Sequence, residues 1–393
     1  MADDTTPSAA PADLSNWREA PHSQWAFHNV DQIVPTAAIA NDPDNISVLK
    51  AALASLDGFS LPLPDGAVLD LAGFLKISAS DALVVLKDGE LVYETYANGT
   101  AVHTPHIIMS ATKSVLGLMV GILQARGDLE VDRLVSDYVP EVADGAYRGA
   151  TLRQLIDMRT GVRLDEAQQR AYEIASHWEP QPLGEAGLGL HDFLASLPPS
   201  EKPHGGPFAY ISANADLMGW AIERATGLSF ASLVSDLLWK PMGAESAAYI
   251  TVDSQGAPRC TGGLCATARD IARIGQLVLD DGVRDGRTIV PKPWLDDIAT
   301  AGDPAAWRDG EWGQAFSFIS PNMRYRAGWY GVDDDPKHIF AMGVHGQNLF
   351  VDKTAGLVVA KLSSQASRID YRALPLTHRA FPEIRRCLVG APS

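Results

Sequence analysis

Segments with the pattern of β-strands lie near both ends of this chain, and segments with the pattern of helices fill the middle. "DALVVLKDGELVYETYANG", residues 81–99, contains two apolar runs around Asp88-Gly89, which predicts a β-hairpin. Near the other end, "HIFAMGVHGQNLFVD" (338–352) and "AGLVVAKLSS" (355–364) have the composition of strands joined by a turn at 353–356. We therefore expect one antiparallel sheet assembled from both ends, flanked by helices, with a mainly helical region inserted: an α+β fold.

The helical segments divide the 393 residues further. Helices are predicted at 46–56, 106–123, 151–158, 190–197, 215–226, 229–243, 267–279 and 371–388, with Gly127 placed to end the second and Thr267 to cap the start of the seventh. We expect an irregular N-terminal arm over 1–45, an α/β region over 46–140 and 260–393, and a helical region over 141–259. The cleft between the two regions is the expected place for chemistry.

Charge and composition exclude several functions. A formal net charge of −16 disfavours binding to nucleic acid or anionic lipid, which leaves a small molecule as the expected partner. The apolar stretch Val115–Leu123 is about half the roughly 20 residues that a membrane span requires. The acidic N-terminus lacks the pattern of a secretory signal, so we expect a cytoplasmic protein. The three cysteines, Cys260, Cys265 and Cys387, have no metal-binding spacing and predict neither a metal site nor structural disulfides.

The segment "HIIMSATKSVLGLMVGIL", 106–123, places Ser110 and Lys113 three residues apart at the start of a long apolar helix. Residues at this spacing share a helix face, so the two side chains can touch. A serine hydroxyl needs a neighbouring base to act as a nucleophile, and burial can hold a lysine neutral by lowering its pKa. The alternative is a capping serine with a solvated lysine, the interpretation we give to the same spacing at Ser47 and Lys50.

Two further motifs carry polar groups suited to acyl transfer. In "PFAYISANADLMGW", 207–220, Tyr210 precedes a helix and could relay a proton if a cation lowered its pKa, with Ser212 and Asn214 holding it in register. In "MGVHGQ", 342–347, which we expect on a strand, Val344 could offer a backbone N–H to an oxyanion, and His345 or Gln347 could orient a substrate. Each motif also has a purely structural interpretation, and a triad of Ser110, His345 and an aspartate stays open.

Taken in this order, the three motifs resemble the serine β-lactamase and penicillin-binding-protein family. The similarity is strongest to its branch of class C β-lactamases, family VIII carboxylesterases and 6-aminohexanoate-dimer (nylon oligomer) hydrolases. The resemblance implies that Ser110 is acylated, that Lys113 and Tyr210 shuttle its proton, and that the amides of Ser110 and Val344 form the oxyanion hole. It implies a β-lactamase/transpeptidase-like fold, no metal or cofactor, and a homodimer.

The chain also departs from that family pattern. Ser212 stands where class C enzymes have the asparagine of Tyr-x-Asn, and Val344-His345-Gly346 replaces Lys-Thr-Gly. Gln168 is expected where nylon-oligomer hydrolases carry a substrate-gripping tyrosine, and Trp178 and Trp329 are expected to wall the acyl pocket. We therefore expect a serine hydrolase of small linear amides or esters. A β-lactamase-type hydrolase and a non-catalytic peptide-binding member of the fold are the alternatives.

Overall fold

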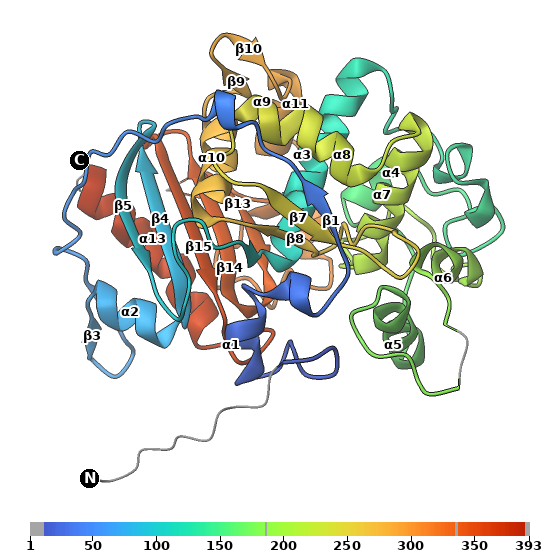
Figure 1. The fold of residues 1–393 in the computed structure, drawn as a ribbon, viewed down its shortest axis with the longest axis horizontal. Coiled ribbons are helices and arrows are strands. Elements are labelled where there is room, and N and C mark those ends of the chain that lie inside the picture. The colour runs from blue at the N-terminus through green and yellow to red at the C-terminus, as the bar shows by residue number, and fades with distance from the viewer. Residues whose placement is uncertain (1–11, 185–186, 335–336, 390–393) are drawn as a thin grey trace.

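A seven-stranded antiparallel sheet forms the centre of the molecule (Figure 1). The computed structural model describes residues 12–184, 187–334 and 337–389. Five strands from the C-terminal part of the chain pair with two strands from the N-terminal part, which lie together at one side, so the sheet is assembled from both ends of the chain, as the sequence predicts. In spatial order the strands are β11 (Met323–Arg326), β12 (Trp329–Val332), β13 (His338–Gly343), β14 (Gln347–Asp352), β15 (Leu357–Ser363), β4 (Ser80–Lys87) and β5 (Glu90–Tyr96).

The predicted hairpin depends on local pairing, whereas the joining of the N-terminal and C-terminal strands depends on pairing between distant segments. Asp88 and Gly89 both adopt positive φ angles, +50° and +81°, as the tight turn between β4 and β5 requires. Strand β15 then lies between β14 and β4, with Val359 opposite both Phe350 and Val85. The sheet is therefore complete only when the last third of the chain has joined the first.

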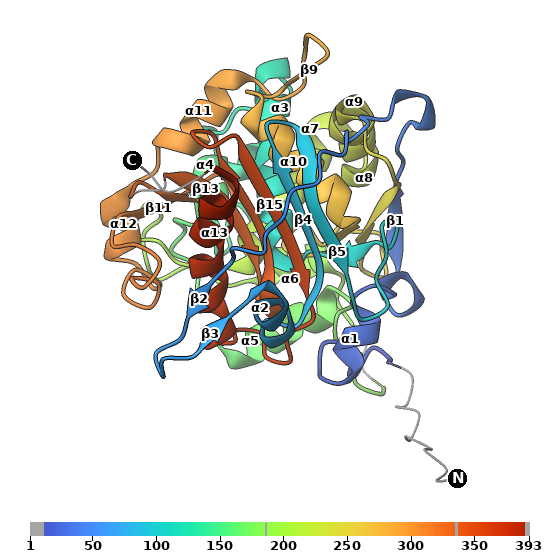
Figure 2. The ribbon, with the colours of Figure 1, turned by 90° about the vertical axis from the view of Figure 1, so that its left-hand side faces the viewer.

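Helices cover both faces of this sheet (Figure 2). On one face lies α10 (Ala268–Leu279), where a Cβ on Gly275 would come within 2.4 Å of Val358 Cγ1. On the other face lies α13 (Ala373–Val389), whose Phe381 ring stacks on Phe350 at 4.7 Å. Because both faces are covered, β14 and β15 are buried along their whole length, including polar residues such as Gln347, Asn348 and Lys361.

A second, four-stranded sheet brings the nucleophile segment into place. Its order is β1 (Thr36–Ile39), β7 (Ala248–Thr251), β8 (Leu264–Ala266) and β6 (His106–Ile107). The expected arm over 1–45 thus contributes a strand, while residues 1–11 of it lie outside the described residues. Strand β6 leads through a short 3-10 turn into α3 (Thr112–Arg126), which ends at Gly127 with a φ of +79°.

The remaining helices lie mostly beside the sheet, on the side where α4 to α8 appear in Figure 1. The division of the chain at 140/141 and 259/260 stays a prediction. None of the helices in the described ranges is long and apolar enough to cross a bilayer. The other elements are α1 (His22–Ala26), α2 (Leu71–Ile77), α4 (Leu152–Ile156), α5 (Glu166–Ala175), α6 (Leu190–Ser196), α7 (Ser212–Thr226), α8 (Phe230–Val234), α9 (Lys240–Met242), α11 (Lys292–Thr300), α12 (Pro304–Arg308), and the hairpins β2 (Leu61–Pro62) with β3 (Val68–Leu69) and β9 (Val283–Arg284) with β10 (Arg287–Thr288).

The predicted helix over 46–56 is wrong. This segment is extended and runs along the outer edge of β5, where the N–H groups of Ala52 and Ala54 donate to the carbonyls of Leu91 and Val92. The N–H of Leu91 donates in return to the carbonyl of Lys50 at 2.8 Å. Backbone pairing with an unfilled sheet edge outweighs the weak helical periodicity of the segment.

Candidate active site

Ser110 lies in the 3-10 turn Met109–Ala111, directly before α3. Met109 has a φ of +47°, an uncommon backbone angle that tends to be found at functional sites. The end of β13 presses against this turn, since a Cβ on Gly343 would lie 2.5 Å from the Ile108 carbonyl oxygen and 3.0 Å from the Ser110 nitrogen. Only a glycine permits this close approach, which fixes the serine relative to the sheet.

Lys113 is buried beside that serine. Its side chain is 1% exposed, and its Nζ lies 3.2 Å from Ser110 Oγ and 2.7 Å from the carbonyl oxygen of Thr261. Burial lowers the pKa of Lys113 to about 7, because desolvation penalises the ammonium form. A large fraction of the lysine is therefore a neutral amine near neutral pH, within hydrogen-bond distance of the hydroxyl.

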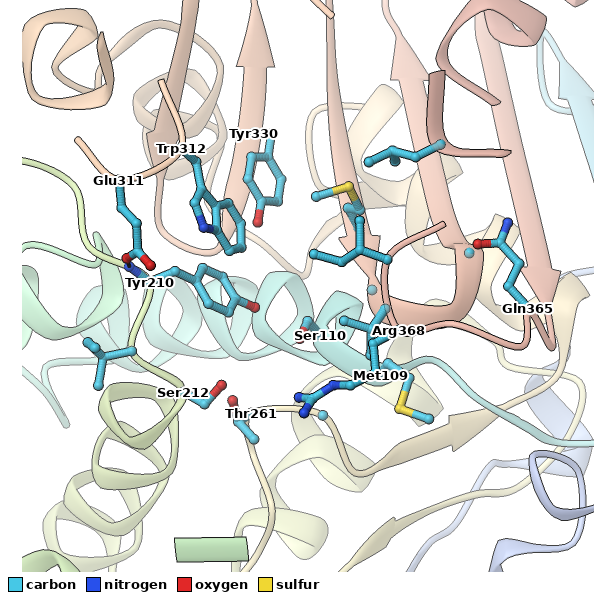
Figure 3. Close-up of a pocket in the computed structure, with 18 of the residues that line it drawn as sticks. Met109, Ser110, Tyr210, Ser212, Thr261, Glu311, Trp312, Tyr330, Gln365 and Arg368 are labelled. Atoms are coloured by element: carbon cyan, nitrogen blue, oxygen red, sulfur yellow. Dashed lines mark hydrogen bonds between the residues drawn. The ribbon is translucent and has the colours of Figure 1, made fainter. Parts of the chain in front are cut away.

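Tyr210 completes a three-residue cluster with Ser110 and Lys113, and Figure 3 shows its phenol directed toward Ser110. Lys113 Nζ lies 4.7 Å from the centre of the Tyr210 ring, and the Ser110 hydroxyl is a hydrogen-bond partner of the phenol. Burial raises the pKa of Tyr210 well above its usual value, and the Ser110 hydrogen bond and the charge of Arg368 offset this only in part. The expected lowering of this pKa by a cation is thus wrong in direction. The phenol stays protonated and can donate a proton.

A cavity of about 660 Å³ opens onto this cluster. Of the residues singled out from the sequence, Ser110, Trp178, Tyr210, Ser212 and Val344 line it. Other lining residues carry no recognisable sequence motif, because segments distant in the chain bring them together. Those that supply charge, hydrogen bonds or an aromatic wall are Arg163, Gln169, Glu173, Arg259, Thr261, Glu311, Trp312, Tyr330 and Arg368.

Two of these unpredicted residues shape the region around Tyr210. The ring of Trp312 stacks on that of Tyr210 with centroids 4.2 Å apart, and Glu311 Oε2 accepts the Tyr210 backbone N–H at 3.3 Å. Figure 3 shows both beside the phenol and Arg368 on the other side of Ser110. The cavity therefore has an aromatic wall and a cation near the serine.

The structure does not bring Gln168 to this cavity. Gln168 is the third residue of α5, where its side chain accepts the N–H of Asp165 at 3.0 Å and its own N–H donates to the Asp165 carboxylate at 2.8 Å. It borders a smaller cavity of about 370 Å³. Its neighbour Gln169 reaches the main cavity instead and donates to Glu173. The expected position is thus one residue away from the residue that lines the cavity.

Asn214 and Trp329 also lie away from the cavity. Asn214 is fully buried and accepts a hydrogen bond from Thr160 Oγ1 at 3.1 Å, because residues two apart on a helix, such as Ser212 and Asn214, do not share a face. Trp329 is 1% exposed and donates through Nε1 to the Ser114 carbonyl. Adjacent strand residues point to opposite faces, so Tyr330 lines the cavity in place of Trp329.

His345 is buried and turned away from the cavity, although its neighbours Val344 and Gly346 line it. The expected strand over 342–347 is interrupted here by a tight turn, 344–346, in which His345 has a φ of +62°. His345 Nδ1 lies 2.7 Å from the Gln365 carbonyl oxygen, and burial lowers the pKa of His345 to about 4. This geometry does not support a triad of Ser110, His345 and an aspartate.

The turn 344–346 lies against the Ser110 turn, and both Ser110 and Val344 line the cavity. Backbone N–H groups beside a serine can stabilise a developing oxyanion, and this role for the amides of Ser110 and Val344 stays a prediction. A metal-binding group of three or more His, Cys, Asp or Glu side chains was not found among the described residues.

Comparison with known proteins agrees with this geometry. A model of the β-lactamase family matches residues 76–381. The chain is 33% identical over 360 residues to a 6-aminohexanoate-dimer hydrolase of Paenarthrobacter ureafaciens, covering 89% of this chain and 88% of the relative. The chain belongs to the β-lactamase family. As a member of this family with named hydrolase and esterase relatives, it is a serine hydrolase of the amidase and esterase type.

Further relatives agree with the assignment of this chain to the β-lactamase family. Esterase EstB of Burkholderia gladioli is 30% identical over 224 residues, which span 51% of this chain and 55% of the esterase. A Bacillus anthracis structure, named as a candidate 6-aminohexanoate-dimer hydrolase, superposes with a TM-score of 0.90 at 27% identity and covers 99% of this chain and 100% of its own. A family VIII carboxylesterase structure, 17% identical with a TM-score of 0.57 over 81% of this chain and 95% of its own, shows the shared fold alone.

Proposed function

We propose that Ser110 of this hydrolase attacks small linear amides and esters, with Lys113 as its base and Tyr210 as the proton donor. The observation that carries this proposal is the buried amine of Lys113, 3.2 Å from the Ser110 hydroxyl, with its pKa lowered to about 7. A base whose pKa lies near the working pH is the most effective in proton transfer.

The residues divide the steps of acyl transfer between them. The Ser110 proton passes to Lys113 Nζ as Oγ bonds to the substrate carbonyl carbon, and the negative charge forms on the carbonyl oxygen. The N–H groups of Ser110 and Val344 receive that charge. Tyr210 gives its proton to the leaving nitrogen or oxygen as the bond to carbon breaks, and the Lys113 ammonium returns a proton to Tyr210. Water then cleaves the acyl ester by the same path in reverse.

The cavity walls support linear substrates that carry a carboxylate. Trp178 and Trp312 offer apolar walls for a methylene chain, and the Ser212 hydroxyl lies near the cluster (Figure 3). Arg368 presents a guanidinium beside Ser110 that suits a carboxylate. The name of the Paenarthrobacter relative supports a linear amide of this kind, and the name of EstB supports ester cleavage. β-Lactam hydrolysis is the alternative activity, and turnover of a panel of substrates compares it with amide and ester cleavage.

Labelling with a fluorophosphonate probe tests the nucleophile. The wild type should be labelled on Ser110, and the folded Ser110→Ala variant should not. Absence of labelling in an active wild type would overturn the proposal. Turnover of p-nitrophenyl butyrate, 6-aminohexanoate dimer and nitrocefin then ranks esterase, amidase and lactamase activity.

We also propose that the enzyme acts in the cytoplasm as a homodimer. The three cysteines carry no disulfide, which supports a reducing compartment, and the resemblance to nylon-oligomer hydrolases supports the dimer. Cell fractionation and light scattering on the purified protein test the two statements separately.

A further inference from the structure

Besides the Ser110 hydroxyl, the amine of Lys113 has a backbone group as its hydrogen-bond partner. Its second hydrogen bond goes to the carbonyl oxygen of Thr261, 2.7 Å away. The N–H of the same residue donates to Oδ1 of Asp216, also at 2.7 Å. Thr261 therefore connects the amine to a buried carboxylate through its two backbone groups.

Asp216 belongs to a buried ionic cluster. Its Oδ2 accepts from Arg259 Nη1 at 2.9 Å and from the Tyr172 hydroxyl, and Arg259 Nη2 lies 3.1 Å from Glu173 Oε1. The side chains of Asp216 and Arg259 are 0% and 2% exposed. Breaking a buried pair of this kind is costly because it leaves an uncompensated charge, so the cluster is rigid. The rigidity passes to Thr261 and through it to Lys113.

The charges that face Lys113 come from three elements. Asp216 lies on α7, Glu173 on α5, and Arg259 on the loop before β8, while the Tyr210 ring covers the amine from the N-terminal side of α7. Asp216 and Glu173 favour the ammonium form of Lys113 and Arg259 opposes it. Arg18, bound to Glu173 at 2.8 Å, compensates part of the acidic charge.

We propose that Asp216, held by Arg259, is a positioning residue for Lys113: it fixes the Thr261 carbonyl against the amine and sets the balance of charge around it. The inference rests on the proposed role of Lys113 as the base. Helix α7 begins two residues after Tyr210, so Asp216 also ties the lysine to the segment that carries the proton donor. The placement of base and proton donor thus depends on one buried carboxylate outside the reacting cluster.

The test measures the rate of fluorophosphonate labelling of Ser110 against pH in three proteins. In the wild type the rate should rise with pH and level off above an acid limb near 7, where Lys113 loses its proton. Asp216→Asn keeps the side-chain size but removes the negative charge, so the amine should lose its proton more easily. Its acid limb should move to lower pH by about one unit, a tenfold change in proton affinity. Its plateau should fall by roughly ten- to a hundred-fold, since a small displacement of a reacting group is costly.

Asp253→Asn is the matched control. Asp253 is also buried, and its carboxylate accepts the N–H groups of Leu190, Gln255 and Ala257, but it does not contact Thr261. This variant should lose stability and keep the wild-type acid limb. An unchanged limb in folded Asp216→Asn, or an equal shift in Asp253→Asn, would overturn the inference. A wild type without labelling at Ser110 would instead overturn the proposed function.

Glu173→Gln decides the matter if Asp216→Asn does not fold. Glu173 acts on Lys113 through charge but does not bond to Thr261. The acid limb should therefore shift down by less than about one unit. A limb that stays in place, or that moves to higher pH, would contradict the proposed charge balance.

Discussion

The side-chain amide of Gln347 pairs with both backbone polar groups of Ser363, donating to its carbonyl at 2.6 Å and accepting its N–H at 3.1 Å. The same Nε2 lies 3.4 Å from the Val344 carbonyl and 3.3 Å from that of His345. With both carbonyls directed at Gln347, the turn that carries the Val344 amide is anchored to the neighbouring strand β15. Gln347 thereby holds the turn that carries Val344, the residue whose amide we propose as an oxyanion donor.

Replacing Gln347 by Met should impair both stability and catalysis. The buried N–H and C=O of Ser363 would lose their partners, at a cost of about 1–3 kcal/mol each in unfolding free energy. The loosened turn should lower kcat by up to about 10²-fold while KM changes little, because an oxyanion donor acts mainly in the transition state. Urea unfolding and steady-state kinetics measure the two effects. A loss of stability with unchanged kcat would show that the Val344 amide does not serve the reaction.

The pH dependence of the wild type follows from Lys113 and Tyr210. The lysine must be neutral to accept the Ser110 proton, so kcat/KM should increase tenfold per pH unit below its pKa of about 7 and then level off. Because burial raises the pKa of Tyr210, the phenol stays protonated and no alkaline decline should appear until well above pH 9 or so. An acid limb near pH 4, the range of His345, would point to a different base.

Lys113→Met should abolish activity and stabilise the fold. The pKa of Lys113 is lower in the folded protein than its ordinary value of 10.5, so the unfolded chain binds an additional proton at neutral pH and folding is penalised. Removing the amine should increase the unfolding free energy by about 1–4 kcal/mol near pH 7. The gain should shrink as the pH rises towards 10.5, where the unfolded lysine also becomes neutral. Melting temperatures of both proteins across this range measure it, and a gain that grows with pH would be contrary to this account.

The variants Gln168→Ala and Gln169→Ala distinguish the roles of two neighbouring glutamines. Loss of the capping side chain of Gln168 should destabilise α5 by about 0.5–2 kcal/mol without changing kcat/KM. Gln169→Ala alters the cavity wall and should raise KM for linear amides. The comparison uses one substrate and both variants, and equal effects on KM would contradict the observed division of roles.

Arg368→Ala should discriminate between substrates by charge. KM should rise for an amide that bears a carboxylate and change little for a neutral ester such as p-nitrophenyl butyrate, since a charge-assisted hydrogen bond is lost only with the former. Arg368→Lys should restore part of the affinity for the charged amide. Equal increases in KM for both substrates would indicate a change in cavity shape rather than in charge recognition.

The sequence predicts the parts of this molecule that depend on local signals. The hairpin at Asp88-Gly89 and the end of α3 at Gly127 are confirmed, because each rests on a backbone angle that few residues adopt. The helix over 46–56 is wrong because its conformation is set by β5, a partner some 40 residues away in the chain. Strands β11 and β12 were not predicted either, as short strands are defined by pairing more than by pattern.

At the site, the motifs identify the right segments but not always the right residue. The spacing of Ser110 and Lys113 makes their contact possible, and the structure brings Lys113 Nζ to 3.2 Å from Ser110 Oγ. By contrast, the motifs do not say which of two neighbouring residues faces the cavity. At 168/169, 329/330 and 344/345, this depends on how one helix, strand or turn is oriented. The charged residues Arg259, Glu311 and Arg368 come from separate loops, and no periodicity in the chain indicates their convergence.

The extended segment along β5 has a consequence for self-association. At Leu91 and Val92, the backbone groups on the outer edge of β5 already form hydrogen bonds with the segment at 50–54. A second copy of the chain could add a strand there only after this segment had dissociated from β5. Edge-to-edge polymerisation is thereby blocked at this strand. A homodimer of this hydrolase would therefore have to form through a surface other than this part of β5.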